Sequence, residues 1–210
     1  FHKTKILIFF GSRNCYRHQL GLMKETKETV RTLFLEKRLA LSPATHEELS
    51  LAIGNQCLQL PIWELEYFHL FLPITQKAEV DTSFILTLLK GRDKQIILPK
   101  VTMESSLTHI LLTDATKIVK NKWGIPEAES GIPIAPSMLQ VIFIPLLGYD
   151  SQGNRVGYGK GFYDAFLKSC KPEVLKIGLS FFEPVAQVKG IHSEDILLDY
   201  CVTPETIHQF

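Results

Sequence analysis

The sequence has little that would attach it to a membrane or to nucleic acid. No apolar run approaches the roughly 18–20 residues that a helix needs to cross a bilayer. Twenty-three Lys and Arg residues against twenty-two Asp and Glu residues leave a net charge of +1. No general basic field therefore draws the chain to nucleic acid or to an anionic membrane. We expect neither kind of partner.

Cysteine is also scarce, and its spacing fits no structural role. No Cys-x-x-Cys pair is present, and no cysteine and histidine residues are spaced as zinc ligands are; the four cysteines are Cys15, Cys57, Cys170 and Cys201. This spacing predicts unpaired thiols in a reducing compartment. The apolar run at residues 6–10 is shorter than the roughly 7–15 residues of a secretory signal core. Both observations favour a cytoplasmic protein.

The hydrophobic pattern predicts an α/β domain. The 210 residues suffice for one domain that buries roughly 70% of its unfolded surface. Three- and four-residue spacing, with capping residues, predicts helices over residues 24–41, 45–60, 82–90 and 162–170. Short apolar runs predict strands over residues 67–73, 96–99, 109–112, 141–145, 174–179 and 201–203. Helices between buried strands are typical of a largely parallel sheet. Proline and glycine predict a loop over residues 120–137, and residues 1–22 fit none of this scheme.

A glycine-rich turn between a predicted strand and a predicted helix is the most informative segment. Gly157, Gly159 and Gly161 alternate along it, and glycine allows the backbone to approach a ligand where any Cβ would obstruct it. Backbone N–H groups in such a turn can bind an anion. Two known phosphate loops do not match, because the spacing fits neither G-x-x-x-x-G-K-[ST] nor G-x-G-x-x-G. A turn that merely reverses the chain tightly is the alternative.

Charged residues on the same turn favour a phosphate site over that alternative. Lys160 supplies a point charge and Arg155 a planar set of donors, and both groups suit phosphate. Asp164 follows within one helical turn and is well placed to hold a divalent cation that bridges phosphate oxygens. The sequence therefore predicts a nucleotide or phosphate site around residues 155–164.

The whole turn, G-N-R-V-G-Y-G-K-G-F-Y-D, resembles the signature of 5-formyltetrahydrofolate cyclo-ligases, also called methenyltetrahydrofolate synthetases. Further segments match in the family's order: Lys27-x-x-x-Arg31, Phe71-Leu-Pro, Glu79-Val-Asp-Thr82, Ile97-Leu-Pro-Lys-Val101, Trp123-Gly-Ile-Pro-Glu127, Asp195-Ile-Leu-Leu-Asp199 and Val202-Thr203. The resemblance covers residues 23–210, which we expect to form a single domain. Residues 1–22 would be an extension outside it, with Met23 as a plausible natural start.

The resemblance implies a fold and a reaction. The fold would be a three-layer α/β/α sandwich with a mostly parallel sheet, as in ribose-phosphate isomerases and coenzyme A transferases. The reaction would close 5-formyltetrahydrofolate, with or without a polyglutamate tail, to 5,10-methenyltetrahydrofolate, with ATP as co-substrate and Mg²⁺ as cofactor. A formamide oxygen is a poor leaving group, so its phosphorylation would let N10 attack and phosphate depart. We expect a monomer.

The resemblance also implies roles for individual residues. The ATP-binding residues would be Lys27, Arg31, Arg155, Val156, Gly157, Tyr158, Gly159, Lys160, Gly161, Phe162 and Tyr163. The folate-binding residues would be Leu72, Glu79, Tyr158, Gly159, Lys160, Gly161 and Phe162. Lys160 and Arg155 would be catalytic, and Asp164 and Asp195 would bind Mg²⁺. The i, i+4 spacing of Lys27 and Arg31 places both on one helix face.

Several alternatives stay open. Lys27 and Arg31 could belong to a solvated charged helix face, Glu79 could be a helix N-terminal charge, and Trp123 fits core packing better than a pterin contact. The chain could also be a non-catalytic nucleotide- or folate-binding module. Sequence drift after a loss of activity would, however, be expected to replace some of the charged site residues, and all of them are present. A kinase or ligase that acts on another amide is the third possibility.

Overall fold

The computed structural model describes residues 24–102, 106–122 and 124–210. The predicted extension over residues 1–22, its neighbour Met23, and the matched Trp123 lie outside these ranges. No helix in the described ranges is both long and apolar enough to cross a membrane.

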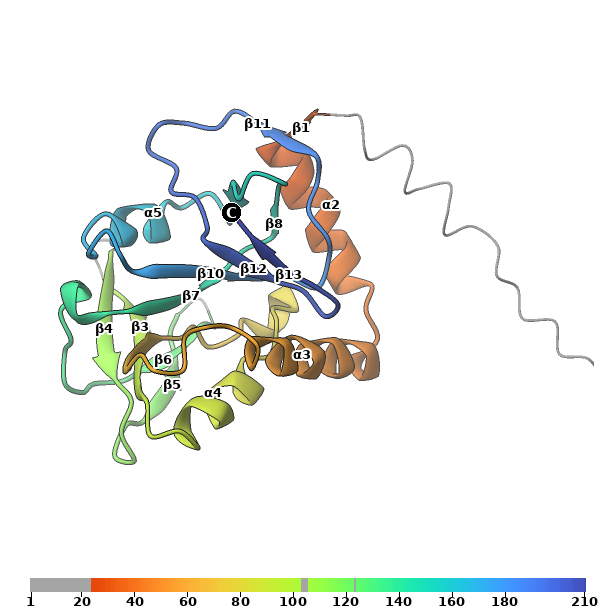
Figure 1. The fold of residues 1–210 in the computed structure, drawn as a ribbon. Helices are drawn as coiled ribbons and strands as arrows, with labels where there is room; N and C mark the ends of the chain where they lie inside the picture. The colour runs from red at the N-terminus through yellow and green to blue at the C-terminus, as the bar shows by residue number, and fades with distance from the viewer. Residues whose placement is uncertain (1–23, 103–105, 123) are drawn as a thin grey trace, which may run out of the picture.

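A seven-stranded sheet forms the centre of the molecule, in the order β13-β12-β10-β7-β2-β3-β4 (Figure 1). Its strands are β2 (Tyr67–His69), β3 (Gln95–Val101), β4 (Leu107–Leu111), β7 (Val141–Pro145), β10 (Leu175–Leu179), β12 (Tyr200–Val202) and β13 (Ile207–Gln209). The five inner strands pair in parallel, and the two edge strands pair antiparallel. The predicted, largely parallel α/β sheet is confirmed.

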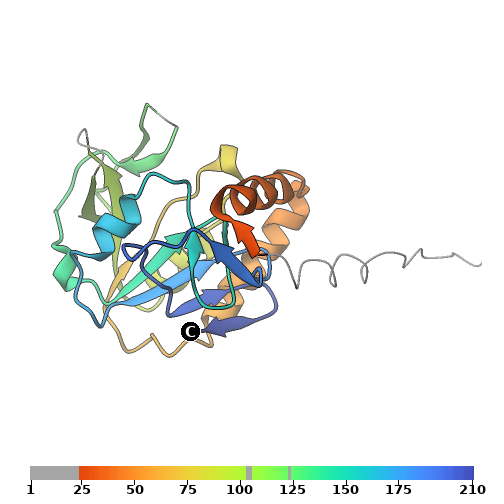
Figure 2. The same cartoon turned by 90° about the horizontal axis from the view of Figure 1, so that it is seen from above.

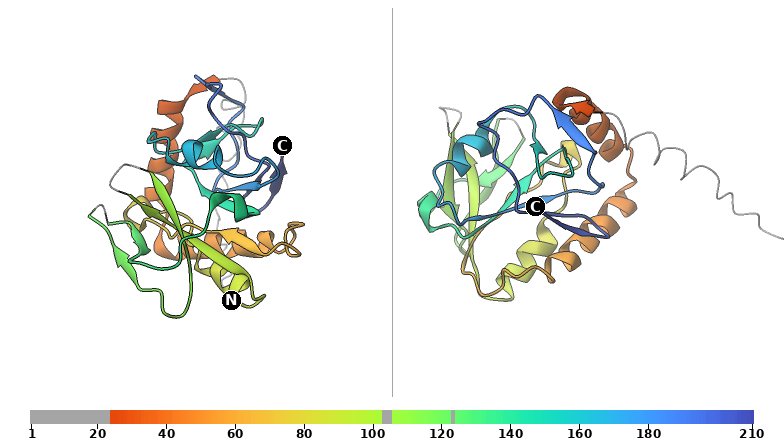
Figure 3. Two further views of the ribbon diagram at one scale, coloured as in Figure 1. Left: turned by 90° about the vertical axis from the view of Figure 1, so that its left-hand side faces the viewer. Right: turned by 45° about the horizontal axis from the view of Figure 1, so that its top comes forward.

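Both faces of this sheet are buried, as its continuous apolar strands require. The helices are α2 (Lys27–Leu39), α3 (Pro43–Cys57), α4 (Ser83–Lys90) and α5 (Phe162–Leu167), with short 3₁₀ turns η1 (Thr75–Lys77) and η2 (Pro136–Met138). Figure 1 shows α3 and α4 on one side of the sheet and α5 on the other, and Figure 3 gives further views of the arrangement. Successive strand residues take opposite faces: Phe143 joins the cluster under α3 and α4, whereas Ile142 joins the cluster under α5.

Helix α2 lies at one end of the sheet and builds a third core. Val30 and Phe34 pack there with Val156 and Val188. Three small two-stranded sheets complete the described fold: β1 (Lys24–Thr26) with β11 (Gln187–Lys189), β5 (Ile118–Lys120) with β6 (Pro126–Ala128), and β8 (Gly148–Tyr149) with β9 (Arg155–Val156). Figure 2 shows β1 and β11 side by side at the start of α2. The first described strand therefore pairs beside α2 with a strand that comes late in the chain.

Several predicted element boundaries were wrong. The strand expected over residues 67–73 ends at His69, and residues 70–73 form no regular element, although the Leu70 N–H still donates to the Ile97 carbonyl at 2.9 Å. The helix expected over residues 162–170 ends at Leu167, and the next residues form turns that close on Phe166 and Leu167 carbonyls. The loop expected over residues 120–137 contains β6 and the start of η2. The hydrophobic pattern located these segments but did not fix where the hydrogen bonds stop.

The predicted cap of α4 is only half correct. Thr82 occupies the N-cap position but makes no capping bond, because its buried hydroxyl donates to the Phe71 carbonyl at 2.7 Å. The Asp81 side chain accepts from the Ser83 N–H at 2.9 Å instead. Thr82 thus joins the start of α4 to the chain that follows β2, where the candidate site lies.

Candidate active site

All fifteen residues to which the sequence analysis gives a site role line one cavity of about 450 Å³. The cavity is bordered by Pro145 at the end of β7, by Phe71 after β2, and by Pro99 and Val101 in the last part of β3. These strands are parallel neighbours, and ligands of open α/β sheets bind beyond the carboxyl ends of such strands. The fold therefore brings the motifs together where a ligand is expected.

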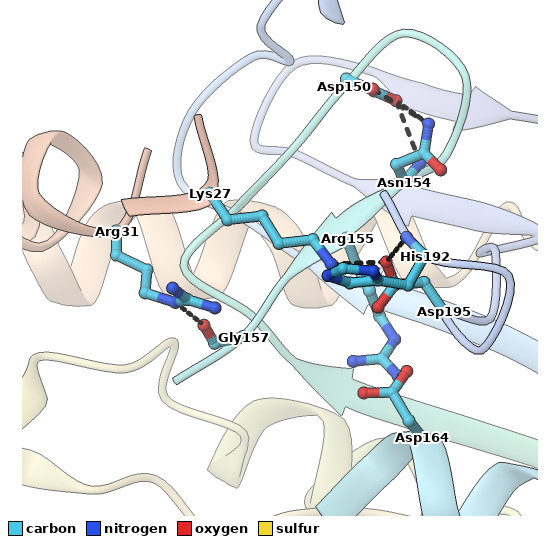
Figure 4. A network of polar contacts seen from close by, with 9 residues as sticks. All are labelled: Lys27, Arg31, Asp150, Asn154, Arg155, Gly157, Asp164, His192 and Asp195. Carbon is cyan, nitrogen blue, oxygen red and sulfur yellow. Dashed lines mark hydrogen bonds and ion pairs between the residues drawn. The ribbon is translucent and has the colours of Figure 1, made fainter. Parts of the chain in front are cut away.

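Helix α2 supplies the cationic side of the cavity (Figure 4). The helix starts at Lys27 because Thr26 caps it, with the Thr26 hydroxyl accepting from the Thr29 N–H at 3.1 Å. The ammonium of Lys27, the first residue of the helix, pairs with Asp195. One turn later, Arg31 Nε donates to the Gly157 carbonyl at 2.9 Å. The i, i+4 prediction is confirmed, since both side chains line the same cavity. They are not a solvated charged face.

Arg155 and Asp164 form a second ion pair beneath the glycine loop. Arg155 is 9% exposed, and its Nη2 lies 2.5 Å from Asp164 Oδ1. Burial lowers the pKa of Arg155, and the carboxylates of Asp164 and Asp195 counteract that effect. Arg155 Nε is buried with no hydrogen-bond partner in the described part of the chain. The guanidinium therefore keeps a donor beyond its pair with Asp164.

The glycine loop needs its glycines for two different reasons. Gly159 has a φ of +85°, and a Cβ there would lie 3.3 Å from Arg31 Nη2. Gly161 has a φ of +71° but no atom within 4 Å of the same position, so only its backbone conformation favours glycine. Lys160 lies between them, exposed at the edge of the cavity. Its ammonium is therefore accessible to a ligand.

The turn before this loop is held by one buried carboxylate. Asp150 accepts from the Asn154 main-chain N–H and side-chain amide at 3.0–3.1 Å, and from the Val188 N–H at 2.9 Å. Asp150 is fully buried, and Figure 4 shows its side chain directed at Asn154. These bonds hold residues 150–154 against β11 and so position the segment that leads into Arg155.

Glu79 is a buried carboxylate in the wall of the same cavity. Only 3% of Glu79 is exposed, and its two carboxylate oxygens accept from the Tyr158 hydroxyl at 2.8 Å and from the Ile74 N–H at 2.7 Å. Burial raises the pKa of Glu79, and both hydrogen bonds oppose that rise. The neighbouring walls are mostly apolar: Phe71, Leu72, Ile74, Pro99, Val101, Leu107, Ile125 and Pro126. Glu79 lies before α4 begins, and it does not serve as a solvent-exposed helix charge.

Sequence reasoning missed Arg38, whose buried guanidinium contacts the Tyr158 hydroxyl at 3.2 Å. It also missed Lys77 and most of the apolar wall. A usable signal existed for Arg38, because it stands four residues after Phe34 and seven after Arg31 on an amphipathic helix. An arginine at those spacings faces the interior rather than water.

The carboxylates of the cavity fit a cation that a phosphate ligand shares. Asp164 and Asp195 both line the cavity, and both lie close enough to Arg155 to affect its pKa. Among the described residues, no cluster of three or more His, Cys, Asp or Glu side chains could hold a metal alone. Mg²⁺ usually takes one or two protein carboxylates together with phosphate oxygens and water. Asp164 and Asp195 fit a site of this kind, which is shared between the protein and a phosphate ligand.

Comparison with known proteins gives the family. The sequence profile of the 5-formyltetrahydrofolate cyclo-ligase family matches residues 23–204. The chain belongs to this family. A 5-formyltetrahydrofolate cyclo-ligase of Mus musculus is 28% identical over 193 residues, which cover 85% of this chain and 90% of the mouse protein. The resemblance seen in the motifs is confirmed.

Solved structures of cyclo-ligase relatives have the same fold. The NMR structure of Aquifex aeolicus 5,10-methenyltetrahydrofolate synthetase superposes with a TM-score of 0.74 at 29% identity, covering 87% of this chain and 92% of that one. The 5,10-methenyltetrahydrofolate synthetase of Mycoplasma pneumoniae gives a TM-score of 0.66 at 24% identity, covering 85% and 99%. A mixed α/β architecture with a central, mostly parallel sheet and few helices is therefore common to these cyclo-ligase structures.

Proposed function

We propose that this protein catalyses the ATP-dependent closure of 5-formyltetrahydrofolate to 5,10-methenyltetrahydrofolate, with release of ADP and phosphate. One observation carries the proposal: in a member of the cyclo-ligase family, all fifteen residues to which the family resemblance gives a site role line a single cavity. One part of that cavity is cationic and the other is apolar around a buried carboxylate. A triphosphate and an aromatic pterin need those two environments side by side.

The reaction follows from the chemistry of the formamide. Its carbonyl is a poor electrophile, and its oxygen cannot leave as oxide. Transfer of the γ-phosphoryl group to that oxygen breaks the bond to ADP and makes an imidate-like carbon that N10 can attack. Departure of phosphate then leaves the methenyl bridge, and N10 gives up its proton. Such transfers need mainly alignment and charge stabilisation.

The cationic part of the cavity would bind the nucleotide. Lys27 and Arg31 lie on one face of α2 and would neutralise the phosphate chain, while Gly157–Gly161 bring backbone N–H groups close to it. Lys160 would stabilise charge on the γ-phosphoryl group during transfer, assisted by Arg155. Val156, Phe162 and Tyr163 would complete the ATP site. Bound Mg²⁺, held by Asp164 and Asp195, would neutralise phosphate charge.

The apolar part would bind the folate. The Glu79 carboxylate would accept hydrogen bonds from pterin N–H groups, a role that suits a carboxylate with unused lone pairs. Leu72 and the ring of Phe162 would contact the aromatic portion, together with residues of the Tyr158–Gly161 loop. Low water content around the formyl group would protect the activated oxygen from hydrolysis.

The proposal extends to the fold class, the extent of the domain, the oligomeric state and the localisation of the protein. We place the topology with the three-layer α/β/α sandwiches of ribose-phosphate isomerases and coenzyme A transferases. Residues 23–210 would form one catalytic domain, active as a cytoplasmic monomer without residues 1–22. Deletion of residues 1–22 should therefore change neither turnover nor melting temperature. A polyglutamate tail on the folate would be accepted.

An omission experiment tests the function. Protein, ATP, Mg²⁺ and 5-formyltetrahydrofolate are mixed, and absorbance of the methenyl chromophore is followed while each component is left out in turn. The expected result is a rise only when all four are present. A protein that binds both substrates without any rise would be a non-catalytic binding module. ADP release without closure of the folate would favour a kinase or ligase that acts on another amide.

A further inference from the structure

Arg38 is a buried cation beside the cavity, and three acceptors satisfy it. It stands in the last turn of α2 with 3% of its surface exposed. Its Nη2 donates to the Leu146 carbonyl after β7, and its Nη1 donates to the Tyr158 hydroxyl at 3.2 Å and to the Lys77 carbonyl at 3.4 Å. A buried guanidinium is stable only when such partners are present. Arg38 thus joins α2 to three segments around the cavity.

The direction of the hydrogen bonds at the Tyr158 hydroxyl is fixed by chemistry. A guanidinium has only donors, so Arg38 must donate and the hydroxyl must accept. The hydroxyl proton is then free to go to Glu79 Oε1, which lies 2.8 Å away. A hydroxyl that accepts from a cation becomes a stronger donor through polarisation. The three side chains form one chain of donors that ends on the Glu79 carboxylate.

The chain of donors leaves Glu79 oriented but not saturated. Its second oxygen accepts from the Ile74 N–H at 2.7 Å, and Ala78 before it takes a left-handed conformation with a φ of +44°. A carboxylate offers about four lone-pair positions, so two bonds leave acceptor capacity for a ligand in the cavity. A non-glycine residue in this conformation costs free energy and persists only where its surroundings determine it. The backbone and the hydrogen bonds therefore fix Glu79 together.

We propose that Arg38 is a positioning residue for the folate: through the Tyr158 hydroxyl, it orients the Glu79 carboxylate toward the ligand. The inference rests on the proposed function, in which Glu79 accepts hydrogen bonds from the pterin. Arg38 itself does not line the cavity and has no role in the motifs of the family resemblance. It acts on the ligand only through Tyr158 and Glu79.

The surroundings of Glu79 determine the sign of the expected pH effect. Burial raises the pKa of Glu79, while the Ile74 N–H, the Tyr158 hydroxyl and the charges of Arg38 and Lys77 oppose the rise. Loss of the Tyr158 hydroxyl removes one of the opposing contributions, so the carboxyl protonates at higher pH. The ionisable groups that face Glu79 are Arg38 from α2, His46 from α3, Lys77 from η1, Tyr158 from the glycine loop and Tyr163 from α5.

The test measures binding of 5-formyltetrahydrofolate by calorimetry, without ATP, across about pH 5–8. Tyr158→Phe should weaken binding about tenfold at neutral pH, and its loss of affinity in acid should begin about one pH unit higher than in the wild type. Tyr149→Phe is the matched control, because it removes a buried tyrosine hydroxyl outside the cavity. It should leave affinity and pH dependence unchanged.

A second variant isolates Arg38. Arg38→Lys keeps the charge but loses the planar pair of donors. The pH at which folate affinity falls in acid (the acid limb of the binding curve) should therefore shift upward, as it does for Tyr158→Phe. Since both variants break one chain, Arg38→Lys should add little in the Tyr158→Phe background. Melting temperatures show whether each variant folds. If Arg38→Lys does not fold, the binding data for Tyr158→Phe decide the test.

The outcomes separate this inference from the proposed function. Unchanged affinity and an unchanged acid limb in a folded Tyr158→Phe variant would overturn the role of Arg38, even if turnover is normal. Fully additive losses in the double variant would also overturn it. A wild type that binds folate but makes no methenyl product would refute the catalytic proposal, and the comparison of affinities would still decide the role of Arg38.

Discussion

The Lys27 ammonium forms an ion pair with the Asp195 carboxylate, which joins the first turn of α2 to the segment before β12. The same Asp195 oxygen accepts from the His192 N–H at 2.7 Å, as Figure 4 shows. Burial alone would raise the pKa of Asp195, but the bonds from Lys27 and His192 outweigh it and lower the pKa. The carboxylate is thus ionised and available to a cation at neutral pH.

Asp195→Asn should raise the Mg²⁺ concentration needed for half-maximal turnover, by about tenfold or more. The amide is a weaker ligand for Mg²⁺ and cannot neutralise its charge. The measurement is the Mg²⁺ dependence of methenyl formation at saturating ATP and folate. Glu194→Gln is the control, because it makes the same charge change one residue away on a side chain that is 71% exposed and paired with Lys168. Equal shifts in both variants would mean that only net charge matters.

Lys160→Met should lower the catalytic rate by on the order of 100-fold, with a smaller effect on ATP binding. Methionine keeps most of the stem and removes the charge that would stabilise the transferring phosphoryl group. Lys27, Arg31 and the loop backbone would still bind the triphosphate. Lys168→Met, at the surface pair with Glu194, should leave the rate unchanged. Near-normal turnover by a stably folded Lys160→Met variant would remove Lys160 from the mechanism.

Gly159→Ala should impair the use of ATP by about tenfold or more. Its Cβ would lie 3.3 Å from Arg31 Nη2, at a φ of +85°, so Arg31 must move. The left-handed conformation also costs about 1 kcal/mol of stability for alanine. Gly190→Ala shares that backbone cost, with a φ of +77° and nothing within 4 Å of the new methyl. The two variants should therefore lose similar melting temperature, and only Gly159→Ala should raise the KM for ATP.

Because two buried histidines have lowered pKa values, we expect the free energy of unfolding to fall in mild acid. His69 and His109 lie with ring centroids 5.3 Å apart, and His109 stacks on Phe166 at 4.1 Å. Burial lowers the pKa of His109 to about 4, and burial together with His109 lowers the pKa of His69. Each unfolded histidine titrates at about 6.5, so between these values the unfolded chain binds more protons. Stability is therefore intact above about pH 6.5 and falls as the pH falls.

The slope should reach at most about 1.4 kcal/mol per pH unit for each histidine. Chemical denaturation between about pH 6.5 and pH 4.5 measures it, above the range in which most carboxylates titrate. His109→Gln removes one titrating group and should flatten the curve. A His109→Gln variant with the same slope as the wild type would show that other groups cause the acid loss.

Local patterns predicted the parts of the site that the chain carries in one segment. Residues 155–164 form a continuous loop and helix start, so their spacing alone places Arg155, Lys160 and Asp164 together. The parallel-sheet prediction then explains why Glu79, which comes after β2, lies near a loop that comes after β7. Adjacent parallel strands end at one edge of the sheet.

Contacts between distant segments were beyond the sequence patterns. Strand β13 and the β1–β11 pair have three residues each, too few for a clear alternation of apolar and polar side chains. The Tyr158–Glu79 bond joins residues 79 positions apart, which no local pattern connects. Helical spacing places Arg38 on the buried face of α2, but its acceptors, the Leu146 and Lys77 carbonyls, come from distant segments that no local pattern identifies.

The most direct test of the central claim measures ADP and methenyl product in the same reaction over time. If the γ-phosphoryl group activates the formyl oxygen, the two products should form in equal amounts from the first turnover onward. Neither should form when 5-formyltetrahydrofolate is omitted. ADP without methenyl product, or methenyl product without ADP, would contradict the account.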